Sequence, residues 1–142
     1  MPPKYSLPEI ERRWLVNLAQ VGDLDSAPFR TIEDIYVRNT RLRLRKVTEA
    51  DGETTYKLGI KYGKVSPLRQ PITNLYLEAH EYEALAALEG ERIRKRRYPV
   101  AGGSLNIYED PAATHAHFEV EFSSENEAEA YVPPAFATEE IT

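Results

Sequence analysis

Charged and apolar residues alternate along several stretches of this chain. In RLRLRK, residues 41–46, arginines alternate with leucines. Successive side chains of a β-strand point to opposite faces, so this stretch would have one cationic and one apolar face. The pattern predicts strands at residues 9–16, 31–37, 41–47, 55–62, 72–77, 91–100, 105–108 and 115–122. Turns are expected at Asn39 and at Asp51-Gly52, and residues 18–30 are expected to form a connection.

Two stretches predict helices. Residues 78–88 have apolar side chains at helical spacing and are followed by Gly90, a residue typical of helix ends. Ser124 and Glu127 have the spacing of a capping box, which predicts a short acidic helix that closes before Pro133. With many strands and few helices, we expect an α+β fold that is mainly β.

Length and composition bound the possibilities. The chain has 142 residues, of which 42% are apolar, so we expect one folded domain covering residues 1–142. Cysteine is absent, which excludes disulfides, thiolate metal ligands and a cysteine nucleophile. The N-terminal sequence lacks the apolar core of a signal peptide, and no stretch reaches the roughly 18 apolar residues of a membrane span. We expect a soluble, cytoplasmic protein whose oligomeric state is left open.

Basic and acidic residues are segregated along the chain. Cations concentrate in residues 38–46, 57–69 and 92–97, whereas the C-terminal third is acidic. The formal net charge is −5 and the isoelectric point is about 5.3, which argues against nucleic acid as the main partner. Each charged strand face, taken singly, is most simply the solvated face of an antiparallel sheet. Solvated faces usually mix signs, however, because like charges on neighbouring strands destabilise the pairing.

Closing such a sheet into a barrel would bring the two kinds of charge together inside. Clustered carboxylates suit a hard divalent cation such as Mg²⁺ or Mn²⁺. Clustered arginines and lysines suit phosphate oxygens, which arginine can bind bidentately. A barrel of about eight strands has room for one small ligand. The pattern is therefore compatible with a metal–polyphosphate complex bound inside a barrel.

Six segments, in chain order, resemble motifs of the CYTH superfamily, the triphosphate tunnel metalloenzymes. Glu9-Ile-Glu-Arg-Arg13 resembles the N-terminal Glu-x-Glu-x-Lys motif. The other matches are residues 32–36 with Arg41-Leu-Arg43, Leu58-Gly-Ile-Lys61, Lys95-Arg-Arg97-Tyr98, Glu119-Val-Glu121-Phe122, and Pro133-Pro134 with Glu140-Ile-Thr142. The resemblance extends over nearly the whole chain.

The resemblance implies a closed tunnel of eight antiparallel strands, with a few helices packed outside, that binds triphosphate together with Mg²⁺ or Mn²⁺. With the charge pattern, it assigns catalytic roles to Glu9, Glu11 and Arg13. Phosphate binding is assigned to Arg41, Arg43, Arg45, Lys57, Lys61, Arg69, Lys95 and Arg97. Metal binding is assigned to Glu9, Glu11, Glu119 and Glu121, with His117 as a further candidate. The expected partner is a small triphosphate or polyphosphate, with neither a nucleic acid nor a membrane.

The chain departs from the family pattern at three places. Arg13 stands where the family has lysine, and a guanidinium does not readily give up a proton. Where the family usually has glutamates after Arg69, this chain has Gln70, Pro71, Ile72 and Thr73. Asn106 stands where the family often has an aspartate. These departures weaken the expected metal site. His117, on the same strand face as Glu119, would compensate for the lost acids as a metal ligand. The simpler interpretation is a partly exposed strand histidine.

Two classes of function follow from this comparison. A metal-dependent phosphohydrolase, acting on inorganic triphosphate or on a small organic triphosphate such as a nucleotide or thiamine triphosphate, would use both acidic pairs and the basic strands. A polyphosphate-binding or nucleotide-binding module without turnover would explain the lost acids. ATP cyclisation is a third option, but no feature that reads a purine is visible. We favour the enzyme, because two acidic pairs held close together need a cation.

Overall fold

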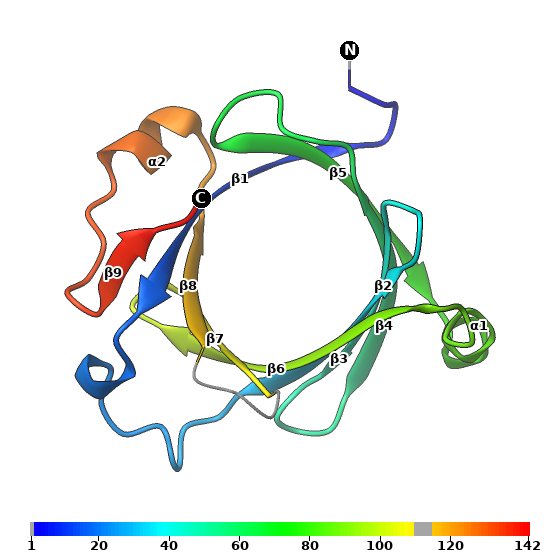
Figure 1. Ribbon diagram of the computed structural model, residues 1–142, viewed down its shortest axis with the longest axis horizontal. Helices are drawn as coiled ribbons and strands as arrows, with labels where there is room; N and C mark the ends of the chain where they lie inside the picture. The colour runs from blue at the N-terminus through cyan, green and yellow to red at the C-terminus, as the bar shows by residue number, and fades with distance from the viewer. Residues whose placement is uncertain (1, 110–114) are drawn as a thin grey trace.

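The computed structural model describes residues 2–109 and 115–142, which contain nine β-strands in one antiparallel sheet (Figure 1). The strands are β1 Leu7–Val16, β2 Arg30–Val37, β3 Leu42–Thr48, β4 Thr54–Lys61, β5 Arg69–Leu77, β6 Gly90–Val100, β7 Gly103–Tyr108, β8 Ala116–Glu121 and β9 Ala137–Glu140. Their order is β5-β4-β3-β2-β6-β7-β8-β1-β9, and β5 also pairs with β1. Strands β1 to β8 therefore form the closed antiparallel barrel expected from the resemblance, which is confirmed.

The helical elements lie outside the barrel (Figure 1). They are the 3-10 helix η1 Leu18–Gln20, α1 Ala79–Leu85 and α2 Glu125–Ala130. Helix α2 begins as predicted, since the Ser124 hydroxyl accepts a hydrogen bond from the Glu127 N–H. None of the helices in the described residues is long and apolar enough to cross a membrane.

The largest buried apolar side chains of β1 and β8 lie on the outer face of the barrel, although some apolar residues, such as Ile72 of β5, line the cavity. Trp14 of β1 and Phe118 of β8 are buried on the outer face, where they form a cluster with Val120 and with Phe136 at the approach to β9. Figure 1 shows α2 and β9 lying against this side of the barrel. The main apolar cluster is thus between the barrel and its outer layer, which leaves the interior free for polar residues.

The largest corrections to the predicted bounds concern one strand and one helix. Strand β5 begins at Arg69, three positions before the expected start at residue 72. Proline is unfavourable inside a paired strand, so Pro71 argued against an earlier start. Pro71 lies beyond the last residue pair between β4 and β5, Lys61 with Ile72, and a strand tolerates a missing N–H at such a position. Helix α1 ends at Leu85 rather than at residue 88.

The structure contains one strand that was not predicted and one turn that was. Strand β9 was not predicted, because its four residues have no distinctive alternation. The turn between β2 and β3 is where it was expected, with Asn39 in the left-handed conformation at φ 60°.

Candidate active site

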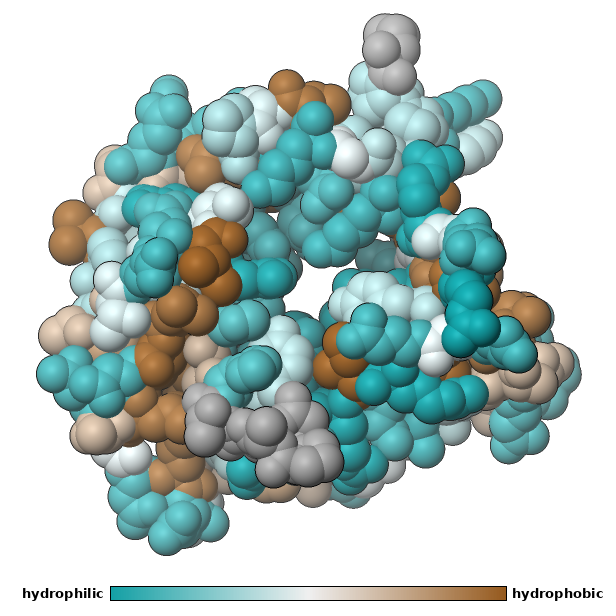
Figure 2. All heavy atoms as spheres, in the orientation of Figure 1, coloured by the Kyte–Doolittle hydropathy of each residue, from teal (hydrophilic) through white to brown (hydrophobic). Residues whose placement is uncertain are grey.

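The barrel encloses a cavity of about 880 Å³. Figure 2 shows an opening in the middle of the molecule that is bordered mainly by hydrophilic residues. Every residue predicted to bind phosphate except Arg69 lines the cavity: Arg41, Arg43, Arg45, Lys57, Lys61, Lys95 and Arg97. The other predicted catalytic and acidic residues line it too: Glu9, Glu11, Arg13, Glu119 and Glu121. The charged strand faces therefore point inward.

Three carboxylates meet on the wall formed by β1 and β8. Glu9 and Glu11 are two positions apart on β1 and so point the same way, and Glu11 lies opposite Glu121 of β8 in the strand register. One oxygen from each of the three carboxylates lies within 4.8 Å of the other two. We call Glu9, Glu11 and Glu121 the acidic group; its oxygens are the ligand type that Mg²⁺ and Mn²⁺ prefer.

The acidic group has too few partners within the protein. Within residues 2–109 and 115–142, Oε1 of Glu9 is buried without a hydrogen bond, although the Lys61 ammonium lies 3.3 Å from it. Burial, followed by the charges of Glu119 and Glu9, raises the pKa of Glu11 to about 7. Carboxylates gathered close together resist ionisation unless a cation offsets their repulsion. The residues present therefore fit a divalent cation.

Glu119 lies beside Glu11 but is not one of the three clustered carboxylates, and it is bound mainly by other protein groups. One of its oxygens accepts a hydrogen bond of 2.6 Å from the side chain of Asn106, and the other lies 3.5 Å from Nη2 of Arg13. Burial alone would raise the pKa of Glu119, but the charges of Arg13 and Arg97 outweigh it and hold this pKa well below its usual range. Of the four glutamates predicted to bind metal, three lie together in the acidic group, and metal binding by them stays a prediction.

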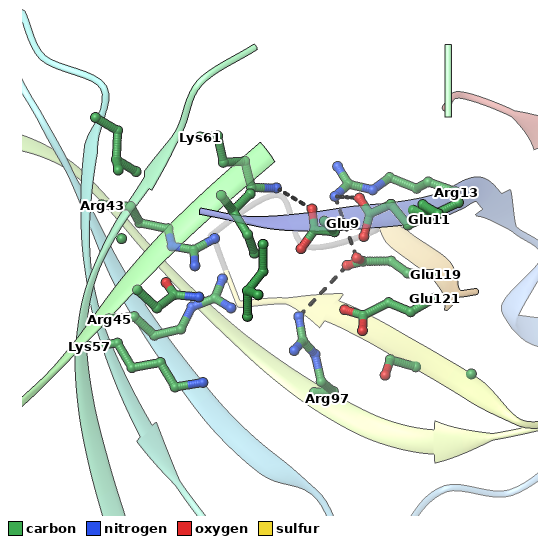
Figure 3. Close-up of a pocket in the computed structure, with 18 of the residues that line it drawn as sticks. Glu9, Glu11, Arg13, Arg43, Arg45, Lys57, Lys61, Arg97, Glu119 and Glu121 are labelled. Carbon is green, nitrogen blue, oxygen red and sulfur yellow. Dashed lines mark hydrogen bonds and ion pairs between the residues drawn. The ribbon is translucent and has the colours of Figure 1, made fainter. Parts of the chain in front are cut away.

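Cations gather on β3, β4 and β6: Arg43, Arg45 and Lys57 lie opposite the acids, whereas Lys61 and Arg97 reach Glu9 and Glu119 (Figure 3). Nε of Arg43 is buried and has no hydrogen-bond partner among the residues that the structure describes. Burial, followed by the charges of Arg45 and Arg97, lowers the pKa of Lys95 to about 7. Burial and the same kind of repulsion also lower the pKa of Lys57. A wall of closely spaced cations suits an anion with several oxygens.

Sequence reasoning missed two residues of the cavity region. Asp34 is only 2% exposed and accepts hydrogen bonds of 2.7 and 2.8 Å from Arg45. Its alternation with Tyr36, which lines the cavity, was the signal that it faces inward. Arg30 also lines the cavity, because it begins β2 rather than ending the connection before it.

Arg69 lies on the outer side of β5, contrary to the role predicted for it. Its Nε pairs with Glu125 of α2 at 3.4 Å. The alternate residues Ile72 and Asn74 line the cavity, and Gln70 lines a hollow of about 270 Å³ beside it. Gln70 is the register partner of Glu9, so an amide faces the acidic group from β5.

His117 faces inward, but the structure does not bring it to the acidic group. Its ring centroid lies 5.1 Å from that of Tyr108 and 6.2 Å from that of His115. Burial, followed by the charge of Arg13, lowers its pKa. The acidic group consists of carboxylates alone within the residues that the structure describes.

The inorganic triphosphatase of Nitrosomonas europaea is 32% identical to this chain over 145 aligned positions, covering 94% of this chain and 89% of that protein. This chain belongs to the CYTH superfamily, the triphosphate tunnel metalloenzymes. A crystal structure of the inorganic triphosphatase NE1496 is 26% identical and superposes with a TM-score of 0.56, over 94% of this chain and 86% of that chain. The CYTH fold is shared with a putative adenylate cyclase from Bacillus halodurans at a TM-score of 0.55 and 17% identity, over 88% of this chain and 86% of that chain. No family model matches the chain.

Proposed function

We propose that this CYTH protein is a metal-dependent hydrolase of inorganic triphosphate. The supporting observation is the charge arrangement of the cavity, in which the acidic group faces the cations of β3, β4 and β6. A triphosphate with a bound divalent cation has the complementary charges, with the metal toward the acids and the phosphate oxygens toward the cations. The similarity to the inorganic triphosphatase of Nitrosomonas europaea supports the same substrate.

The acidic group and the cations of the cavity have different roles in the proposed reaction. Glu9, Glu11 and Glu121 would hold Mg²⁺ or Mn²⁺, which when bound neutralises phosphate charge and lowers the pKa of a coordinated water. Arg43 and Lys95 bind phosphate oxygens, as do the other cations that line the cavity. In the hydrolysis, water attacks the terminal phosphorus, the bond to the bridging oxygen breaks, and phosphate and pyrophosphate leave. The fixed cations stabilise the charge that develops on the leaving oxygens.

Arg13 acts as a fixed charge in this proposal. Its Nη2 lies 3.3 Å from Glu11 and 3.5 Å from Glu119, so the guanidinium sits between a member of the acidic group and the separately bound Glu119. A guanidinium stays protonated at every pH at which the protein would work. Arg13 therefore orients the two carboxylates rather than donating a proton.

The test is phosphate release from inorganic triphosphate with Mg²⁺, with Mn²⁺ or with chelator, across neutral to alkaline pH. ATP and thiamine triphosphate are measured in parallel, because the same cavity chemistry applies to any triphosphate. We expect turnover of inorganic triphosphate that chelator abolishes. Turnover that persists in chelator, or preference for an organic triphosphate, would contradict the proposal.

A second candidate, a binding module without turnover, is favoured by one observation. Gln70, opposite Glu9, and Asn106, beside Glu119, are amides at positions close to the carboxylates. Amides are weaker metal ligands than carboxylates, so this site has fewer charges to hold a cation. Triphosphate that raises the melting temperature without being hydrolysed under any metal condition would establish this candidate. For either candidate, we propose a cytoplasmic location and small phosphates as the only partners.

A further inference from the structure

One carboxylate lies on the cationic wall itself. Asp34 faces inward from β2, is 2% exposed, and is close enough to Arg43, Arg45 and Lys95 for their charges to act on it. Burial would raise the pKa of Asp34, but its hydrogen bonds to Arg45 and these charges hold the pKa below its usual range. Asp34 is thus ionised where it repels the phosphate oxygens that this wall is proposed to bind, so its position needs another explanation.

Asp34 holds the guanidinium of Arg45 with both carboxylate oxygens. Nε of Arg45 donates to Oδ1 at 2.7 Å and Nη2 donates to Oδ2 at 2.8 Å. The two residues are also register partners of β2 and β3, so the backbone already aligns them. A guanidinium has five N–H donors in one plane, and this contact uses two of them and fixes the plane.

Arg45 lies among other cations and would be displaced without this contact. Lys57 is its register partner on β4, and Arg43 is two positions away on the same strand face. Repulsion from these neighbours and the freedom of a long side chain both favour many orientations of an unheld arginine. A side chain that is ordered before binding loses less entropy when the ligand arrives.

We propose that Asp34 is a positioning residue that fixes Arg45 so that its remaining N–H groups face a phosphate chain in the cavity. The inference rests on the proposed function for the identity of the anion, inorganic triphosphate. Asp34 touches neither the phosphate nor the metal and acts through Arg45. Its repulsion of the anion is the smaller effect, and the ordered guanidinium is the larger one.

The variant Asp34→Asn separates these two effects because they have opposite signs. Removing the negative charge alone would tighten triphosphate binding, whereas releasing Arg45 would weaken it. We expect affinity for inorganic triphosphate, measured by calorimetry in chelator, to fall about tenfold, and kcat with Mg²⁺ to fall by a similar factor. Tighter binding with unchanged kcat would overturn the proposal. The control is Glu33→Gln, the neighbouring acid on the outer face, which pairs with Arg94 and should change neither quantity more than about twofold.

A double-mutant cycle tests whether Asp34 acts through Arg45. Arg45→Lys keeps the charge but cannot make the bidentate contact. In this background, Asp34→Asn should change triphosphate affinity less than about twofold. An effect of Asp34→Asn as large as in the wild type would show that Arg45 is not the intermediary, and would overturn the proposal.

Asp34→Glu keeps the test decisive if Asp34→Asn does not fold. This variant retains the charge but moves the carboxylate by one methylene, so Arg45 is held in a different place. We expect weaker triphosphate binding and lower kcat; wild-type values for both would overturn the proposal. The calorimetric measurement needs no turnover. If the wild type binds triphosphate but never hydrolyses it, the proposed function fails, and the binding measurements still decide the role of Asp34. If the wild type does not bind triphosphate, the proposed function and the role of Asp34 both fail.

Discussion

The two faces of strand β1 differ in nearly every property. Glu9, Glu11 and Arg13 point into the cavity, where their charges are only partly matched within the protein. Ile10 and Trp14, between and beyond them, are buried on the outer face with exposures of 4% and 3%. The common arrangement of a small barrel, with apolar residues inside, is thus reversed. Stability and the proposed chemistry lie on opposite faces of the same strand.

The outer layer supplies the apolar packing that the polar interior of the barrel lacks. Trp14 packs against Phe118 with ring centroids 6.0 Å apart, and Tyr131, which follows α2, covers it at 5.7 Å. Arg12, also on the outer face, donates to Glu140 of β9 at 2.7 Å and to the Ala128 carbonyl at 2.8 Å. Because α2 and β9 bury the apolar face, the interior need not supply a core. Substitutions on one face should therefore alter one property and spare the other.

Glu11→Gln gives the largest expected effect on the inner face. It removes one carboxylate of the acidic group, and we expect metal-dependent triphosphate hydrolysis to fall at least about a thousandfold, roughly 4 kcal/mol of transition-state stabilisation. Triphosphate binding in chelator should persist, because the cationic wall is untouched. Phosphate release at saturating Mg²⁺ is the measurement, with Glu139→Gln, on exposed β9, as the matched control. Wild-type kcat in Glu11→Gln would remove this residue from the site.

Trp14→Ala tests the outer face in the same strand. Truncating a buried aromatic side chain costs about 3–5 kcal/mol of unfolding free energy. We expect that loss in urea unfolding, with kcat per folded molecule unchanged within about twofold because no inner residue is altered. The control is Tyr5→Ala at a position that is 82% exposed. A parallel collapse of kcat in folded protein would show that the two faces are coupled.

The fold was predictable because alternation marks strands reliably, and the order of the motifs indicated how they close. Alternation alone could not say which face is inside, since solvated and enclosed charged faces have the same pattern. Arg69 was assigned to the cavity without a strand face, because β5 was expected to begin only at residue 72; as the first residue of β5 it faces outward, one position out of phase with Gln70 and Ile72.

The remaining features of the site depend on contacts between strands. The role of Asp34 becomes visible only once β2 and β3 are paired. The hydrogen bond that Glu119 accepts from Asn106 depends on β7, which brings Asn106 beside it. Each of these contacts joins residues of two different strands, so the pattern of a single strand could not predict it.

Arg43→Ala is expected to have the next largest effect on the inner face. Arg43 lines the cavity, and its buried Nε has no hydrogen-bond partner in the described part of the chain, so its charge is available to an anion. Loss of one charge-assisted contact should weaken triphosphate binding in chelator about 30-fold, roughly 2 kcal/mol. Calorimetry measures this, and Arg38→Ala, an outer arginine paired with Glu89, should leave the affinity unchanged. Equal affinities for Arg43→Ala and the wild type would place the phosphate elsewhere.

The smallest expected effect is a pH dependence of stability caused by Lys95. Its pKa is about 7 in the folded protein against 10.5 in a free side chain, so the unfolded chain binds more protons between these values. The free energy of unfolding of the ligand-free protein should therefore gain a contribution that rises with pH over this window, by at most about 1.4 kcal/mol per pH unit. Below pH 7 both states are protonated, and the cost of burying the charge is fully present.

Lys95→Met removes this contribution, while most other groups titrate alike in the two proteins; the carboxylates on which Lys95 acts, Asp34 and Glu119, have lowered pKa values and stay ionised between pH 7 and 9. In urea unfolding with chelator, the variant should gain stability relative to the wild type at pH 7, and this gain should shrink by roughly 2 kcal/mol toward pH 9. Lys46→Met, at an outer residue that is paired with Glu33, should show a difference that does not vary with pH. A constant difference for Lys95→Met as well would mean that Lys95 titrates normally. The cationic wall would then be better solvated than its burial indicates, and the contrast between the two faces of the barrel would be weaker on this side.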